Sequence, residues 1–344
     1  MFNTASFPSI LEGHNADLSH VSKDLINGLR IYNNGRSYIL GNLALSEGLQ
    51  PHKAINSSPN DLEYKLIMQS ALLLANQSYN RPLVLTTGFP YSTHQINKSN
   101  AKKFLESIHR IEYDASTFGD QKRAVKVVEV TQAEILPEMM GNVVGLRKGD
   151  YQADGSFFAV SLGFGTFEAA LSTPNGIVQR TTVSKMGIQY AVDLFTSEMA
   201  KDYYLGLKSK KQLDVVFQKD FIVLNRTKID ITKIKAQVLT QYYQDIISPS
   251  LRNAFNDSDF ALSDKMYITG GGALYGDLID CFYNEFRDIV DVEVVHNPLT
   301  LTSQGYCLHS LDISQGNKVG AIGIDVGNAN TVVTQFEDGA FGWK

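Results

Sequence analysis

The sequence predicts an α/β protein of two domains, each built on a sheet that helices cover. An apolar strand runs into a glycine-containing turn at three places, residues 157–165, 266–272 and 321–327. Stretches with apolar residues three and four positions apart lie between such strands and indicate amphipathic helices. Strands alternating with helices are typical of α/β folds. The length of 344 residues suggests roughly two domains of ordinary size.

The composition narrows the possible classes of protein. Hydrophobic residues make up 43% and charged residues 19%, as in ordinary globular proteins. A net charge of −5 gives no electrostatic reason to expect direct binding to nucleic acid or to an anionic membrane. Only two cysteines, Cys281 and Cys307, argue for a reducing compartment. No run approaches the roughly 18 apolar residues of a membrane span, and the N-terminus lacks a signal peptide, so we expect a cytoplasmic protein.

The first part of the chain predicts strands followed by a covering helix. Strands are expected near residues 7–10 and 37–41, on either side of the turn 33–35. The cluster of Ser, Pro, Asn and Asp at 56–61 suits a loop and a helix cap. The helix that follows carries apolar residues on one face. The strand 82–87 is apolar on both faces, which fits the middle of a sheet with helices on each side.

A valine-rich strand is predicted at residues 124–130, with Thr131-Gln132-Ala133-Glu134 following at its carboxyl end. Ligand-facing residues of open α/β sheets lie at such strand ends. Gln132 could therefore orient a water molecule, and Glu134 could polarise one. The alternative is a first helical turn whose polar residues only favour the helix dipole.

A polar segment bounded by glycines, residues 148–155, predicts the crossing into the second domain. That domain opens with a strand and a glycine turn, residues 157–171. The turn has the layout of the turn near the C-terminus, and two such hairpins could hold one polyphosphate. Helices are predicted after Gly187 and from Thr232 to Phe255.

The buried strand Met266–Thr269 runs into three glycines and then a helix. Glycines at this point let the backbone approach a ligand closely and place its flat or anionic part at a helix N-terminus. A glycine turn needed only for packing is the alternative.

The final element is a hairpin, residues 321–333, whose turn is made of glycine and asparagine. Backbone N–H groups of Gly327 to Thr331 would converge on a phosphate. Asp325 would hold the water shell of a Mg²⁺ ion, which prefers few carboxylates and several waters. A plain surface hairpin is the alternative. No histidine has metal-ligand spacing to another His or Cys, so no protein-only metal site is expected.

These motifs together resemble the actin, Hsp70 and sugar kinase superfamily, and most of all the plasmid-segregation actins of the ParM/StbA type. Asp325-Val326-Gly327-Asn328-Ala329-Asn330-Thr331 resembles the first phosphate motif, and Leu162-Gly163-Phe164-Gly165-Thr166 resembles the second. Gly270-Gly271-Gly272-Ala273 resembles the adenosine motif. The resemblance implies two ribonuclease H-like domains, each on a mixed five-stranded sheet, with a nucleotide cleft between them. We expect domain I at 1–155 plus 299–344 and domain II at 156–298.

The order of the motifs differs from that of the family. There the first phosphate motif precedes a segment like Phe7-Pro8-Ser9, whereas here it follows at the other end of the chain. Joining Lys344 to Met1 restores the family order, so the chain resembles a circular permutant. Two residues also depart from the pattern. Ser161 stands where the family usually has an aspartate, and Val332 stands where actin and many ParM proteins have a lysine.

The resemblance implies an ATP-dependent, filament-forming ATPase of the cytoskeletal, plasmid-partition kind, with an adaptor protein linking it to DNA. ATP or ADP and Mg²⁺ are the expected cofactors, and Gln132, Glu134 and Asp325 the expected catalytic residues. The expected nucleotide-binding residues are Gly327, Asn328, Ala329, Asn330, Thr331, Gly163, Phe164, Gly165, Thr166, Gly271, Gly272 and Ala273. Asp325 would hold Mg²⁺ through water. Two alternatives remain, an ATP-binding scaffold with little hydrolysis and a small-molecule kinase on the same fold.

Overall fold

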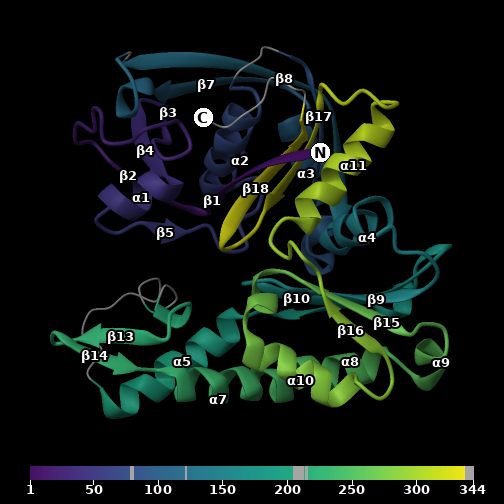
Figure 1. Ribbon diagram of the computed structural model, residues 1–344. Helices are drawn as coiled ribbons and strands as arrows, with labels where there is room; N and C mark the ends of the chain where they lie inside the picture. Colours follow the sequence, from purple (N-terminus) through teal and green to yellow (C-terminus); the bar gives the residue numbers. More distant parts are fainter. Residues whose placement is uncertain (78–80, 121, 204–212, 214–215, 338–344) are drawn as a thin grey trace. The chain divides into compact units, whose positions relative to one another are not determined.

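The computed structural model describes residues 1–77, 81–120, 122–203, 213 and 216–337. The chain divides into two compact units, Met1–Ala153 with Thr300–Lys344, and Asp154–Leu299. Each is an α/β unit with its own hydrophobic core. In Figure 1 the two ends of the sequence scale, purple and yellow, belong to the same unit.

Unit 1 is organised around one ten-stranded sheet in the order β1-β18-β17-β6-β8-β7-β3-β4-β2-β5 (Figure 1). Its strands are β1 (Phe2–Pro8), β2 (Ile10–Gly13), β3 (Arg30–Asn33), β4 (Arg36–Leu40), β5 (His52–Lys53), β6 (Leu83–Phe89), β7 (Ile108–Asp114), β8 (Arg123–Pro137), β17 (Ala321–Val326) and β18 (Asn330–Phe336). Its helices are α1 (Gly41–Glu47), α2 (Leu62–Ala75), α3 (Tyr91–Leu105), α4 (Glu138–Lys148) and α11 (Leu301–Ile313), with a 3-10 turn at Ala115–Thr117.

The fifteen-residue strand β8 makes this sheet continuous. Its first half pairs antiparallel with β7, and its second half pairs parallel with β6. The resemblance implied a five-stranded sheet in each domain. The strands β1-β18-β17-β6-β8 do form such a group, but β8 extends it into five further strands. One strand thus belongs to both halves of the sheet.

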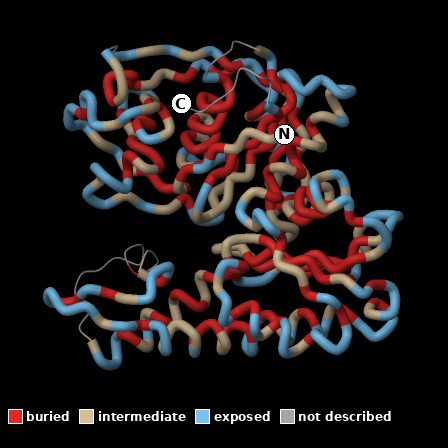
Figure 2. The backbone as a smooth tube through the Cα atoms, viewed as in Figure 1, coloured by how far each residue is buried: buried red, intermediate tan, exposed pale blue. Residues whose placement is uncertain are grey.

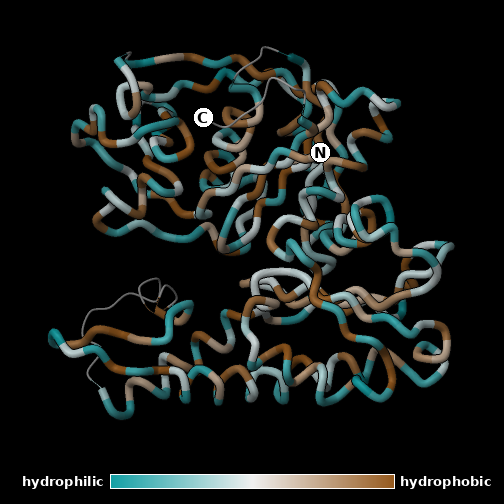
Figure 3. The backbone as a smooth tube through the Cα atoms, in the orientation of Figure 1, coloured by the Kyte–Doolittle hydropathy of each residue, from teal (hydrophilic) through white to brown (hydrophobic). Residues whose placement is uncertain are grey.

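Helices cover both faces of the β17-β6-β8 region. On one face, α2 and α3 contribute Tyr64, Leu66 and Leu105 to the core that includes Leu85 and Ile324. On the other face lies α11, whose Ser310 donates a hydrogen bond to the carbonyl of Ile322 over 2.7 Å. Figure 2 shows these strands and α2 largely buried, and Figure 3 shows that hydrophobic residues gather there. Burial of apolar surface on both sheet faces therefore fixes the strand ends that carry the candidate site.

Helices α4 and α11 pack with their backbones in contact, because glycines face each other. A Cβ on Gly305 of α11 would overlap the carbonyl oxygen of Gly141 and lie 2.8 Å from the nitrogen of Gly145, both in α4. A Cβ on Gly323 of β17 would overlap the carbonyl of Ser303 in α11. Helix α11 is therefore held tightly between α4 and the strand that leads to the hairpin turn.

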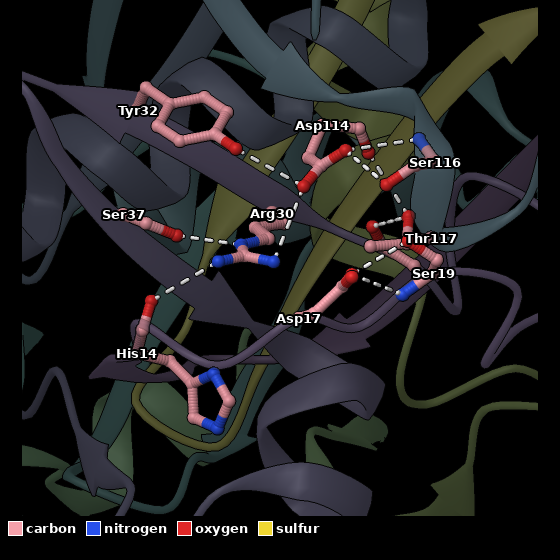
Figure 4. A network of polar contacts seen from close by, with 10 residues as sticks. His14, Asp17, Ser19, Arg30, Tyr32, Ser37, Asp114, Ser116 and Thr117 are labelled. Carbon is pink, nitrogen blue, oxygen red and sulfur yellow. Dashed lines mark hydrogen bonds and ion pairs between the residues drawn. The ribbon is translucent and has the colours of Figure 1, made fainter. Parts of the chain in front are cut away.

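The outer half of the unit 1 sheet holds a buried ion pair, Arg30 with Asp114, at 3.3 Å (Figure 4). Tyr32 donates to one carboxylate oxygen of Asp114 over 3.1 Å, and the hydroxyl of Ser116 donates to the other over 2.6 Å. Arg30 also donates to Ser37 over 2.6 Å. The network ties β3, β4 and β7 together with their charges satisfied, which a buried ion pair requires to be stabilising.

We expect an Asp114→Asn variant to lose roughly 2–3 kcal/mol of folding free energy, because the charge of buried Arg30 loses its partner while the side-chain shape is kept. Urea unfolding of the whole chain measures this. The control is Glu112→Gln, which removes the exposed pair with Arg123 and should cost less than about 1 kcal/mol. Equal losses in the two variants would contradict a stabilising role for the buried pair.

Unit 2 contains a six-stranded sheet in the order β11-β10-β9-β15-β16, with β12 also paired to β10, and a separate hairpin, β13-β14. The strands are β9 (Phe157–Leu162), β10 (Thr166–Thr173), β11 (Gly176–Ile177), β12 (Val183–Met186), β13 (Phe221–Leu224), β14 (Thr227–Asp230), β15 (Lys265–Thr269) and β16 (Asp291–Val294). The helices are α5 (Gln189–Asp202), α7 (Thr232–Tyr242), α8 (Ser248–Ala254), α9 (Asp257–Phe260) and α10 (Gly276–Phe286).

One face of the unit 2 sheet packs on its helices. Phe158, Val160 and Leu162 of β9 share a core with Phe195 of α5 and Phe282 of α10. The long helix predicted from Thr232 to Phe255 is interrupted, since a π-helical segment at Tyr243–Ile247 separates α7 from α8. Short 3-10 turns occur at Gln179–Thr181 and Gly271–Leu274.

Candidate functional site

The predicted C-terminal hairpin is confirmed as β17 and β18, paired so that Val326 faces Thr331. Gly327, Asn328 and Ala329 form its turn, and the N–H of Gly327 donates to the carbonyl of Asn330 over 3.1 Å. The N–H groups of Asn328 and Ala329 have no acceptor among the described residues. Two adjacent N–H groups without acceptors are a suitable binding place for an anion.

Two other segments hold this turn in place. The N–H of Ser9, between β1 and β2, donates to the carbonyl of Ala329 over 2.9 Å, and its hydroxyl lies 2.9 Å from that of Thr331. Asn56, in the loop before α2, exchanges two hydrogen bonds with the side chain of Asn328. These contacts hold the turn at Asn328, Ala329 and Thr331 and keep its shape.

Asp325 lies one residue before the end of β17, beside the turn. Its carboxylate makes no hydrogen bond or ion pair with another residue that the structure describes. The residue keeps some exposed surface, but enough protein surrounds the carboxyl group that burial raises its pKa to about 7. A partly buried carboxylate without a partner can bind a cation or the water shell of one.

Three parallel strands end at the same edge of the sheet, which places several chemical groups near Asp325. β17 pairs parallel with β6, and β6 with β8, so the registers put Asp325 level with Gly88 and Leu136. Strand β8 ends at Pro137, and Glu138 begins α4 immediately after it. With about 4.8 Å between neighbouring strands, Glu138 and Asp325 lie at the same edge, two strands apart.

Sequence reasoning did not single out Glu138, because it placed the end of this strand too early. The strand does not stop at Val130, so Gln132 and Glu134 lie within β8 instead of beyond its carboxyl end. Gln132 is exposed, and Glu134 forms an ion pair with Lys102 of α3 at 3.1 Å. The apolar pair Ile135-Leu136 before Pro137 was the available signal, since it continues the strand and proline fits the start of a helix.

In unit 2, the second predicted hairpin is confirmed as β9 and β10, with Gly163, Phe164 and Gly165 in its turn. Thr166 is the first residue of β10. Three successive carbonyls of the turn accept hydrogen bonds from successive N–H groups at the start of α5. Gln189 donates to Phe164 over 2.9 Å, Ile188 to Gly163 and Gly187 to Gly165 over 3.1 Å. The helix start therefore sets the position of the turn.

Ser161 belongs to a row of polar residues that crosses the unit 2 sheet. It faces Thr269 of β15 on one side and Glu168 of β10 on the other, and Glu168 in turn faces Ser184 of β12. Directly paired residues point to the same face, here opposite to the face of Val160 and Leu162. The carboxylate absent at Ser161 is thus present one strand away, at Glu168.

The glycine segment after β15 packs against the second hairpin. Gly270 has φ of 86°, a left-handed conformation that glycine adopts without strain, and its N–H donates to the carbonyl of Pro298 over 2.9 Å. A Cβ on Gly272 would lie 2.6 Å from the Cβ of Leu162. Gly271, Gly272 and Ala273 form a 3-10 turn, not the first turn of a long helix, and α10 begins only at Gly276.

The structure thus brings the predicted residues together in two groups, one within each unit. Asp325 and residues 327–331 lie together in unit 1, and residues 163–166 and 271–273 lie together in unit 2. Among the described residues, no group of three or more His, Cys, Asp or Glu side chains is arranged to hold a metal ion. Every helix in the part of the chain that the structure describes is too short or too polar to cross a membrane.

Comparison with known proteins gives a consistent result. Residues 2–141 match the family described as actin-like proteins, N-terminal domain. No curated protein matches the sequence. A 15-stranded ParM filament from Clostridium botulinum is similar in structure, with a TM-score of 0.70 at 16% identity over 89% of this chain and 92% of that one. The archaeal actin homologue Ta0583 is similar with a TM-score of 0.69 at 14% identity, over 90% of this chain and 92% of that one.

Bacillus thuringiensis ParM gives a TM-score of 0.58 at 13% identity, over 90% of this chain and 92% of that one. The fold of this chain is therefore actin-like, as the resemblance implied.

Proposed function

We propose that this chain, whose fold is actin-like, binds Mg-ATP, assembles into filaments with it and hydrolyses it. The observation that carries the proposal is the hairpin turn at residues 327–329, where two N–H groups have no acceptor among the described residues. Beside them lies the carboxylate of Asp325, which makes no hydrogen bond or ion pair with any of those residues. An anion-binding turn next to a cation-binding carboxylate suits a metal-bound phosphate. Structures of similar fold support this, since Ta0583 is in complex with ADP and the B. thuringiensis ParM with ATP.

The proposed nucleotide-binding residues are those of the three glycine motifs, with Asp325 holding Mg²⁺ through water. They are Gly327, Asn328, Ala329, Asn330, Thr331, Gly163, Phe164, Gly165, Thr166, Gly271, Gly272 and Ala273. Bound Mg²⁺ would neutralise phosphate charge. The residues of this chain would position the phosphates and the attacking water, which is the main work of a protein in phosphoryl transfer.

For the group that acts on the attacking water we propose Glu138 beside the earlier candidates Gln132 and Glu134. Glu138 follows the end of β8, at the strand edge that carries Asp325, whereas Gln132 and Glu134 lie within the strand. A Glu138→Gln variant should release phosphate from ATP at least about tenfold more slowly, since general-base catalysis contributes roughly 10²–10⁴-fold.

Its binding of a slowly hydrolysed ATP analogue should be nearly unchanged. Gln132→Ala and Glu134→Gln serve as matched comparisons in the same phosphate-release assay. If either of them slows release more than Glu138→Gln does, the catalytic role belongs to that residue instead.

Self-assembly is the second part of the proposal, and the similarity to a ParM filament supports it. Head-to-tail contacts between identical subunits propagate into open filaments when they do not close into a ring. A nucleotide favours assembly when it binds one conformation of the subunit more tightly than another. We further propose that an adaptor protein links the filament to plasmid DNA, because the net charge of −5 favours no direct contact.

The proposal places the filament in the cytoplasm, where the two free cysteines, Cys281 and Cys307, would stay reduced. Ser161 favours one second candidate, an ATP-binding scaffold with little hydrolysis. A serine at that position keeps a hydrogen-bonding group without the charge of a carboxylate.

A pelleting assay run beside a phosphate-release assay tests the function. We expect polymer above a critical concentration with Mg-ATP or a slowly hydrolysed analogue, and disassembly as ADP accumulates. ATP binding without pelleting in any nucleotide would remove the filament and leave the scaffold. Pelleting without phosphate release would remove the ATPase.

We also propose that the chain is circularly permuted. The proposal is supported by the pairing of its first and last strands in one sheet. β1 pairs antiparallel with β18, and the N–H of Glu337 donates to the carbonyl of Met1 over 3.0 Å. β17, β18 and β1 thus form one meander, although Lys344 itself lies outside the described residues. A chain rejoined from Lys344 to Met1 and reopened before Val319 is the control for the assembly assay, since it should fold and bind ATP as the parent does.

A further inference from the structure

Asn56 forms two hydrogen bonds with the side chain of Asn328, one through its backbone and one through its side chain, although 272 positions separate the two residues. The backbone N–H of Asn56 donates to the side-chain oxygen of Asn328 over 2.5 Å, and the side-chain N–H of Asn328 donates to the side-chain oxygen of Asn56 over 3.2 Å. Asn56 has φ of 50°, a conformation that asparagine tolerates better than most residues. We call this reciprocal pair the Asn56–Asn328 clasp.

The rest of the loop anchors the clasp to the sheet. Two residues before Asn56, the N–H of Ala54 donates to the carbonyl of Ser9 over 3.0 Å. The N–H of Ser9 donates in turn to the carbonyl of Ala329, in the hairpin turn itself. The turn is therefore fixed at two neighbouring residues, through a backbone bond at Ala329 and through a side chain at Asn328.

The clasp has a direct consequence for the backbone of the turn. An asparagine in a turn commonly uses its side-chain oxygen to accept from backbone N–H groups close by in the chain. In this turn such bonds would occupy N–H groups that an anion would need. Because Asn56 engages both ends of the Asn328 amide, the side chain is held away, and the N–H groups of Asn328 and Ala329 keep no acceptor among the described residues.

We infer that Asn56 is a positioning residue for nucleotide binding, which keeps the 327–329 turn ordered and open to a polyphosphate by holding Asn328. The inference rests on the proposed function and adds to it a residue far away in sequence. Asn56 itself does not touch the nucleotide in this role. Its effect passes through Asn328, which makes it separable by experiment.

The test is a double-mutant cycle in Mg-ATP affinity. Asn56→Gly keeps the positive φ and the backbone N–H that donates to Asn328, and it removes only the side-chain acceptor, so that one bond instead of two orients the Asn328 amide. Loss of one hydrogen bond of this kind is worth roughly 0.5–1.5 kcal/mol, equivalent to a two- to tenfold weaker Mg-ATP affinity. In an Asn328→Ala background the same Asn56→Gly change should alter affinity by less than about 1.5-fold, because its partner is gone.

The matched control is Asn60→Gly, the same substitution in the same loop. The Asn60 side chain makes no hydrogen bond to another described residue, so its removal should leave affinity unchanged. A positioning role also predicts that the maximal rate of phosphate release at saturating ATP stays close to that of the parent while KM rises. A merely structural role would instead lower the melting temperature of Asn56→Gly well below that of Asn60→Gly.

The possible failures can be told apart. A parent that binds Mg-ATP as tightly as its Asn56→Gly variant overturns this inference alone. So does a loss of affinity that persists in full in the Asn328→Ala background, because Asn56 would then act by another route. A parent that binds no Mg-ATP overturns the proposed function, and this inference with it.

Discussion

A Gly305→Ala variant should be less stable than the parent by about 4 kcal/mol, beyond the usual cost of overpacking a core. The added methyl group would overlap the carbonyl oxygen of Gly141, which is backbone and cannot rotate away. Helix α11 cannot retreat to the other side, because Gly323 of β17 is in equally close contact with it. One of the two contacts has to open, and the apolar packing around it is lost.

Thermal unfolding measures this effect, as a fall in melting temperature of roughly 10 °C. The control is Gly276→Ala, at the first position of α10, where a Cβ would meet no atom within 4 Å. That change should be neutral or slightly stabilising, because alanine restricts the unfolded chain. If the Gly305→Ala variant has the same melting temperature as the parent, α4 and α11 pack less closely than described.

The Asp325→Asn substitution should have two large effects of opposite sign. Without nucleotide and in the presence of a chelator, it should stabilise the protein at pH 8. The pKa of the folded carboxyl group is about 7, above its unfolded value of about 3.9. The native state therefore holds this proton more tightly, and the parent loses stability as pH rises from about 4 to about 7. At pH 8 the free energy of unfolding of the variant should exceed that of the parent by roughly 2–4 kcal/mol, and at pH 4 the two values should be equal.

The same variant should bind Mg-ATP about 100-fold more weakly than the parent, because interactions with a charged group are worth up to about 3 kcal/mol. Denaturant unfolding over pH 4–8 measures the first effect, and titration with a fluorescent ATP analogue at fixed Mg²⁺ measures the second. Higher stability excludes misfolding as the reason for weaker binding. Parent-like affinity would remove Asp325 from the site.

Local residue chemistry was sufficient to predict the two hairpins. Gly327-Asn328 and Gly163-Phe164-Gly165 lie between apolar strands. Glycine and asparagine favour tight turns, so each pair of strands is expected to form a hairpin. The expectation of an actin-like fold came from the resemblance of these turns and of the glycine segment after β15 to motifs of a known superfamily. The predicted strand end at Val130 is wrong, because the polar residues that follow it do not end the strand. They lie instead where β8 changes partner from β7 to β6, and the register shifts at Leu83 and Val84 opposite.

The remaining features depend on contacts between distant residues, which no local pattern reports. Nothing around Asn56 distinguishes it from other loop asparagines, and its partner lies 272 positions away. The same holds for the row that sets Glu168 of β10 beside Ser161, which requires the pairing register of the sheet. Glu138 is an intermediate case, since Pro137 before it was a visible signal for a helix start.

Strand β8 also has a mechanical consequence for unit 1. Its fifteen residues span about 46 Å at roughly 3.3 Å per residue, from the pairing of Arg123 with Asp114 at one end to Glu138 just beyond the other. The two ladders divide this strand between them, β7 along its first half and β6 along its second, with a register shift where they meet. The two halves of the sheet are therefore joined through the backbone of β8 alone, and a twist of one half against the other should concentrate near Val130, where few ladder hydrogen bonds would break.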